Sequence, residues 1–230
     1  MKTAIMRRIP LATALILAVA PTLSAQKKTA PRPESKAGAA CKIIATAPWV
    51  KRQAEWFDES THAWTNDTLR TALLSAAGIT APLSAPVQMG VQVAGQSRQL
   101  GATADSMRAQ LKTLASTRGS AWPTKSVVGP AGVHAVYLLV ERDSALATSV
   151  LRRLMEAGPA ESPAVDVATL EDRLRIQTGR KQLYGTQFRV DDRGSIVLAP
   201  MEDSAHADLR REDAGLPPFV LGLCLAKNTK

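Results

Sequence analysis

The sequence is poor in the residues from which most metal centres and nucleophilic sites are built. Its 230 residues include two cysteines and three widely separated histidines, His62, His134 and His206. No His-x-x-x-His pair occurs, and His206-Ala207-Asp208 supplies at most two adjacent ligands. The Gly-x-Ser-x-Gly elbow and a glycine-rich phosphate loop ending in Lys-Ser or Lys-Thr are absent as well. We therefore expect no metal and no cofactor.

Positive charge is plentiful, but most of it lies outside the region that is expected to fold. The formal net charge is +9; Lys2, Arg7 and Arg8 contribute three of these charges, and residues 26–40 contribute another net three. The remaining net +3 on residues 41–230 comes from basic residues interspersed with acidic ones. Nucleic-acid binding needs clustered phosphate contacts, so we expect no nucleic-acid partner.

Long apolar runs are also scarce, and the one at the N-terminus predicts export. Ile9 to Ala20 follows the three basic residues and precedes small residues that end at Ala25, which is typical of a secretory signal peptide, residues 1–25. As a helix the run would rise only about 18 Å, against roughly 30 Å for the hydrocarbon core, which disfavours the alternative of a membrane anchor. The exported chain, periplasmic or secreted, is then expected to have no transmembrane segment. Residues 26–40 are polar and predict a disordered linker, and residues 41–230 predict a single helical domain.

The two cysteines stand at the two ends of that domain. Cys41 begins it and Cys224 lies six residues before the last residue. An even number of cysteines in an exported chain favours a disulfide between them. The alternative is a pair of buried free thiols.

Most of the domain shows the apolar spacing of amphipathic helices. Helices are expected within residues 46–64, 66–78, 103–119, 130–142, 143–158, 164–179 and 201–215. Asn66 and Asp166 are predicted N-caps. Trp49, Trp56, Phe57 and Trp64 recur near helical spacing and are expected to line one buried face. Residues 79–95 hold two prolines and two glycines and predict a loop with at most a short extended piece.

One late stretch has a different pattern. Residues 187–190 and 195–198 flank Asp191-Asp192-Arg193-Gly194 and predict a β-hairpin with a four-residue turn. The predicted fold is therefore mainly α, with about seven packed helices and one late β-hairpin.

Polar residues gather around this hairpin and form the candidate site. The candidates are Asp172 and Arg173 in the sixth helix, Tyr184, Thr186 and Gln187 before the hairpin, and Arg210 and Arg211 in the last helix. Gly185 frees the backbone beside the tyrosine, and the threonine and glutamine could satisfy loop amides. The cluster is thus either a structural clamp or a functional site.

These same residues resemble a bacterial family catalogued as domain of unknown function 6624. The resemblance lies in Trp122-Pro123, Leu170-Glu171-Asp172-Arg173, Tyr184-Gly185-Thr186-Gln187, Pro200-Met201-Glu202-Asp203, and Ala207-Asp208-Leu209-Arg210-Arg211 with Gly215-Leu216. It covers about residues 66–222, and it implies no known activity.

One position departs from the family pattern. Glu141-Arg142 stands where the family typically has Gln-His. If that histidine serves as a base in relatives, this chain lacks it, and His134 is a poor substitute on spacing. If the segment only packs, the change has no functional effect.

Two functional hypotheses follow, and whether the protein is an enzyme stays open. In the first, the domain binds a small molecule or a protein partner in a groove beside Tyr184 to Gln187. In the second, it is a hydrolase or transferase acting on an anionic small molecule. Arg210 and Arg211 would then hold the anion, and Tyr184 or Asp172 would move a proton. An enzyme needs Asp172, Tyr184 and an arginine around one open concavity, whereas a structural cluster is closed and fully paired.

Overall fold

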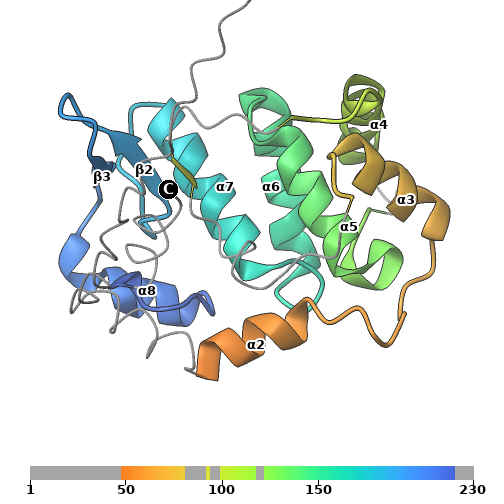
Figure 1. Cartoon of the computed structure of the whole chain (residues 1–230), viewed down its shortest axis with the longest axis horizontal. Coiled ribbons are helices and arrows are strands. Elements are labelled where there is room, and N and C mark those ends of the chain that lie inside the picture. The colour runs from red at the N-terminus through yellow and green to blue at the C-terminus, as the bar shows by residue number, and fades with distance from the viewer. Residues whose placement is uncertain (1–47, 81–91, 94–98, 118–121, 221–230) are drawn as a thin grey trace, which may run out of the picture. The chain divides into compact units, whose positions relative to one another are not determined.

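The computed structural model describes residues 48–80, 92–93, 99–117 and 122–220. The predicted signal peptide, the linker, Cys41 and Cys224 lie outside these residues. Within them the chain forms α2 (Pro48–Trp56), α3 (Asp67–Ala76), α4 (Ala104–Ser116), α5 (Lys125–Val140), α6 (Ser144–Ala157), α7 (Ala164–Gln177) and α8 (Ala207–Asp213). These seven α-helices and one late hairpin confirm the mainly α fold (Figure 1). No helix in these ranges is both long enough and apolar enough to cross a membrane.

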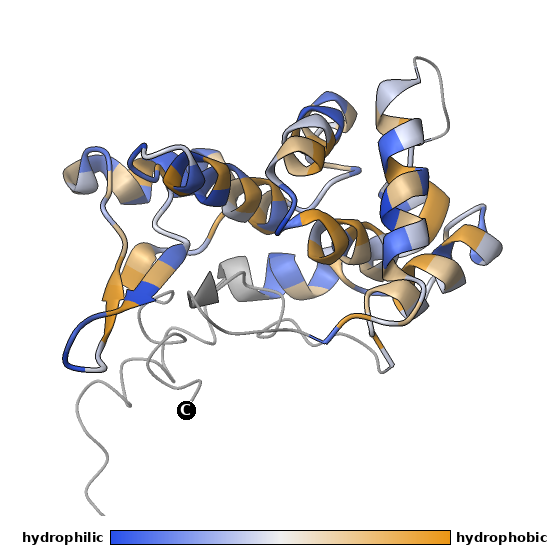
Figure 2. Ribbon diagram, turned by 90° about the horizontal axis from the view of Figure 1, so that it is seen from above, coloured by the Kyte–Doolittle hydropathy of each residue, from blue (hydrophilic) through white to orange (hydrophobic). Residues whose placement is uncertain are grey.

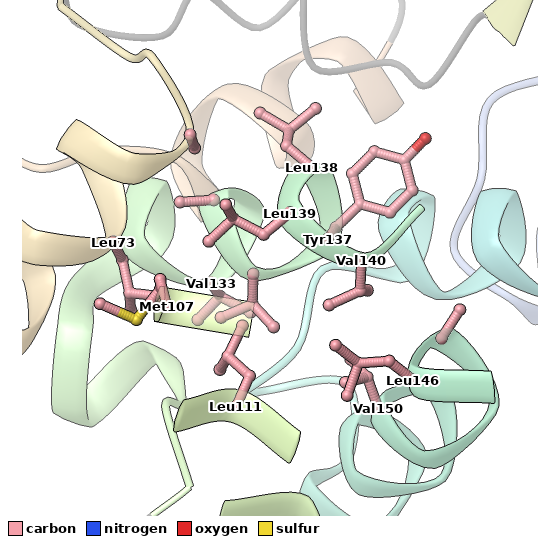
Figure 3. Packing of buried hydrophobic residues seen from close by; sticks show 14 of the residues in the cluster. Leu73, Met107, Leu111, Val133, Tyr137, Leu138, Leu139, Val140, Leu146 and Val150 are labelled. Carbon is pink, nitrogen blue, oxygen red and sulfur yellow. The ribbon is translucent and has the colours of Figure 1, made fainter. Parts of the chain in front are cut away.

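The central element is α5, which packs against α3, α4, α6 and α7. Every residue from Val128 to Val140 is buried, because this stretch is apolar on all sides apart from His134. Figure 3 shows Val133 and Val140 of α5 among side chains of the neighbouring helices. α5 begins at Lys125, five residues before the predicted start at Pro130, and Gly129, with a φ of +71°, kinks the helix directly before that proline.

Two details of the predicted helices were wrong. Trp64 does not share a helical face with Trp56, because α2 ends at Trp56; the Trp64 ring instead lies 4.6 Å from the guanidinium carbon of Arg70. Asp166 does not cap the sixth helix, because α7 begins at Ala164 with Pro163 as its N-cap residue. The Asp166 carboxylate contacts His134 instead.

The hairpin consists of β2 (Gln187–Val190) and β3 (Ile196–Leu198), which pair antiparallel. Figure 2 shows its turn as a hydrophilic tip next to an apolar strand. A third strand, β1 (Gln92–Val93), pairs in parallel with β2, so the order is β1-β2-β3. The short extended piece expected within residues 79–95 is thus strand β1. β2 is the middle strand of the sheet and contacts α7.

Candidate functional site

The loop before the hairpin is held from α7 by a single carboxylate. Asp172 is fully buried and accepts hydrogen bonds from the backbone N–H groups of Leu183 (2.6 Å), Tyr184 (3.0 Å) and Thr186 (3.0 Å). The hydroxyl of Thr186 donates a fourth bond at 2.9 Å. A tight buried loop leaves its amides without backbone partners, and Asp172 supplies the missing acceptors.

A glutamine that the sequence analysis did not single out joins the loop to the sheet. Gln182 is fully buried; its Nε2 donates to the carbonyls of Gln187 (3.0 Å) and Ala199 (2.8 Å). Its Oε1 accepts from the Gln187 N–H at 2.9 Å. The side chain therefore pairs with backbone groups at the ends of both hairpin strands. The Gln187 side chain in turn donates to the carbonyl of Thr169 in α7.

The two arginines of α8 hold the same loop from the other side. Arg211 is 3% exposed, and it donates to the carbonyls of Tyr184 (2.5 Å) and Pro217 (2.5 Å). Burial lowers its pKa to about 10, which leaves it charged at neutral pH. Arg210 donates to the carbonyls of Leu183, Glu202 and Asp203. Both guanidinium groups are thus occupied by main-chain oxygens.

Arg173 lies elsewhere, in a polar contact between α5 and α7. It donates to Glu141 Oε2 at 2.6 Å, and the Tyr137 hydroxyl donates to the same oxygen at 3.2 Å. Burial raises the pKa of Tyr137 well above its usual value, so the hydroxyl keeps its proton. Figure 3 shows this hydroxyl turned away from the aliphatic side chains of the core. Glu141 therefore holds Arg173, while the side chain of Arg142 is half exposed.

A second buried pair lies next to this contact. His134 Nδ1 is 2.9 Å from both carboxylate oxygens of Asp166, and both residues are buried. The Tyr137 ring stacks on the imidazole, with ring centroids 5.6 Å apart. Burial raises the pKa of Asp166, and the contact with His134 opposes part of that rise. No group of three or more potential metal ligands occurs among the described residues.

Beside the clamped loop lies a cavity of about 210 Å³. The end of α6, the start of α7, Tyr184 and Ala214 form its walls, which include no ionisable side chain other than the tyrosine. Burial raises the pKa of Tyr184, and the charges of Glu171 and Asp172 raise it further, so the phenol stays neutral. Ser162 also lines the cavity, and its buried Oγ has no hydrogen-bond partner in the described part of the chain.

The structure therefore brings most of the predicted site residues together, but around a closed backbone loop. Asp172, Thr186, Gln187 and Arg211 are buried and bonded to that loop or to one another. Arg210 touches the loop through a carbonyl, and Arg173 does not touch it. Of the set, Tyr184 is the residue that lines the cavity.

The fold and this loop define a mainly helical domain with a carboxylate-clamped turn before a late hairpin. The model of DUF6624, a family of unknown function, matches residues 67–228, so the chain belongs to that family. This confirms the resemblance noted from the sequence. The comparisons with curated proteins and with solved structures found no match.

The geometry predicts that the Tyr184 hydroxyl contributes little to folding. Tyr184→Phe should leave the free energy of unfolding within about 0.5 kcal/mol of the wild type, because that hydroxyl has no hydrogen-bond partner among the described residues. Tyr137→Phe is the matched control and should cost about 1 kcal/mol, since its hydroxyl donates to Glu141. Urea unfolding measures both. Equal losses in the two variants would contradict the assignment.

Proposed function

We propose that this domain is a binding module and that its site is the cavity beside Tyr184. The observation that carries the proposal is the composition of the cavity. Its walls are mainly apolar, and they adjoin the loop that Asp172 and Gln182 hold by hydrogen bonds. Apolar concave sites with a few fixed polar groups are typical of small-ligand binding.

The clamp supports this proposal because it fixes the tyrosine backbone on both sides. The Tyr184 N–H donates to Asp172, and the Tyr184 carbonyl accepts from Arg211. A wall that is already ordered loses little conformational entropy when a ligand binds. In this proposal, the polar residues around Tyr184 serve to hold the cavity wall in place.

The same contacts make the enzyme hypothesis the weaker of the two. Arg211 is buried, and Arg210 already donates to three main-chain carbonyls, so an anion held by both guanidinium groups would require this packing to open. Proton transfer by Asp172 would have to displace loop amides from a fully buried carboxylate. Binding in the cavity requires neither change.

Export remains part of the proposal, and it rests on the N-terminal sequence. The basic residues, the apolar run and the small residues before Gln26 support secretion of a chain that begins near that residue. The disulfide between Cys41 and Cys224 depends on that export. Such a protein would present its cavity outside the reducing cytoplasm.

Filling the cavity should abolish binding without unfolding the domain. Ala214 lines the cavity and is partly exposed, so Ala214→Trp should place its indole inside. We expect small neutral probes such as toluene and phenol to bind the wild type and to lose at least about tenfold in affinity in this variant, because the indole displaces them. Chemical-shift titration by NMR measures the affinities.

The control is Ala109→Trp, at an exposed position of α4 far from the cavity walls in sequence. It should bind the probes as the wild type does. Absence of binding to the wild type up to the solubility limit of the probes would overturn the proposal, and so would equal binding by both tryptophan variants.

A further inference from the structure

One acidic side chain of α7 lies next to the cavity. Ala164, Val167 and Ala168 of this helix line the cavity. Glu171 follows four residues after Val167 and three after Ala168, so it lies on the same face of the helix, one turn further on. Because the Cα–Cβ bonds of a helix tilt toward its N-terminus, the Glu171 side chain leans back toward these lining residues. The helix geometry therefore places a carboxylate at the edge of the cavity.

The charge of Glu171 also acts on the tyrosine in the cavity wall. Burial raises the pKa of Tyr184, and the charges of Glu171 and Asp172 raise it further. Arg210 and Arg175 lower it by less. Negative charge thus dominates at this part of the wall.

The basic residues nearest to Glu171 are engaged elsewhere. Arg175 lies four residues later, a spacing that favours an ion pair with a preceding glutamate. Its guanidinium binds the Glu202 carboxylate instead. The Nε of Arg180 donates to the Thr178 hydroxyl at 3.2 Å. Glu171 consequently forms no hydrogen bond and no ion pair in the part of the chain that the structure describes.

This carboxylate would gain from a cation beside it. Burial raises the pKa of Glu171 and the charge of Asp172 raises it further, while Arg175 and Arg180 lower it. A cation placed beside Glu171 would stabilise the ionised form, and an anion there would be repelled. Since the side chain is partly exposed, a charged group can contact it without losing all of its own hydration.

The cavity itself limits the rest of the ligand. A cavity of about 150 Å³ lined by aliphatic and aromatic residues binds benzene. The cavity beside Tyr184 measures about 210 Å³, and apart from that tyrosine its walls contain no ionisable side chain. One ring, or a chain of similar volume, fits inside, whereas a charged group is more favourably placed at the edge.

Resting on the binding function proposed above, we infer that the ligand is an organic cation of single-ring size, whose apolar part fills the cavity and whose ammonium group lies beside the Glu171 carboxylate. Glu171 is then the residue that selects for positive charge. The apolar walls supply the contact area and do not distinguish charges.

Benzylammonium, benzyl alcohol and benzoate test this selection, because they are single rings of similar size with a positive, a neutral and a negative group. In Glu171→Gln we expect the dissociation constant of benzylammonium to rise about threefold relative to that of benzyl alcohol. The dissociation constant of benzoate should fall by about the same factor, and that of benzyl alcohol should stay unchanged. Chemical-shift titration by NMR at pH 7 and low ionic strength measures all three.

The matched control is Asp105→Asn, which removes one negative charge from an exposed residue of α4, a helix that contributes no residue to the cavity lining. It should leave the ratios of the dissociation constants unchanged. Salt gives a second readout on the wild type, because a rise from about 0.01 M to about 1 M shortens the Debye length from roughly 30 Å to roughly 3 Å. The added salt should weaken benzylammonium relative to benzyl alcohol, and less so in Glu171→Gln.

Equal ratios in the wild type and Glu171→Gln, equal shifts in Asp105→Asn, or the absence of a salt effect on the wild type would each overturn the inference. A strongly lowered melting temperature of Glu171→Gln would do so as well, since it would give the side chain a structural role. In all these cases the binding function still stands if benzyl alcohol binds the wild type and Ala214→Trp excludes it. Failure of every neutral probe to bind the wild type would overturn the binding function, and this inference with it.

Discussion

Replacing Asp172 by asparagine is expected to lower the free energy of unfolding by about 3 kcal/mol or more. The carboxylate accepts four hydrogen bonds from the loop, three of them from backbone N–H groups. An asparagine amide has one oxygen to accept these bonds, and its NH₂ group would face N–H donors. At a fully buried position no water replaces the lost acceptor.

Urea unfolding at neutral pH measures this loss. The matched control is Glu171→Gln, the same change of carboxylate to amide one residue earlier, on a partly exposed side chain. It should change the free energy of unfolding by no more than about 0.5 kcal/mol. If the two variants were equally stable, Asp172 would not be the residue that holds the loop.

The Asp172 clamp explains why an otherwise helical chain contains this stretch of polar residues. Between α7 and β2 the chain turns, and Asp172 accepts hydrogen bonds from the backbone amides of that turn. Gly185 takes a φ of +70°, and a Cβ there would lie 2.5 Å from the ring of Phe219, so only glycine fits. Asp172 and Gly185 therefore meet requirements of this turn, and the cavity lies beside it.

Much of this architecture could be predicted from local sequence. The helices follow apolar spacing and capping residues: Asn66 does accept from the N–H of Leu69, as predicted for an N-cap. The hairpin follows from two short apolar strands around Asp191–Gly194. Gly185 was expected to free the backbone beside the tyrosine, and it takes a φ of +70°, which glycine adopts readily. Each of these features depends on residues close together in the chain.

The features that were missed depend on packing between distant segments. His134 and Asp166 are 32 residues apart, and no spacing rule pairs them. Gln182 could equally have been an exposed loop glutamine, and its burial becomes visible only once β2 and β3 are in place. The cavity is likewise a product of the way in which two helix ends, one loop and Ala214 meet.

The largest effect after that of Asp172 is expected at the buried pair of α5 and α7. His134→Leu should lower the free energy of unfolding at pH 7 by about 3 kcal/mol, because it leaves the Asp166 carboxylate buried without its partner. The double variant His134→Leu with Asp166→Ala removes the isolated charge and roughly keeps the volume of the pair. It should therefore regain most of the lost stability at pH 7.

Lowering the pH should reduce the difference in the free energy of unfolding between these two variants. Burial raises the pKa of Asp166 above its ordinary value of 3.8, Glu141 raises it further, and His134 is the contact that opposes the rise. Without His134 the folded state binds a proton at a higher pH than the unfolded state does, so stability is lost as the pH rises through the folded-state pKa. The free energy of unfolding of His134→Leu should therefore approach that of the double variant as the pH falls from 7 toward 4.

Urea unfolding of both variants across this pH range measures the difference. Both variants lack the histidine, so the comparison reports on Asp166. A gap that stays constant or widens in acid would show that the Asp166 carboxylate is not the buried charge responsible.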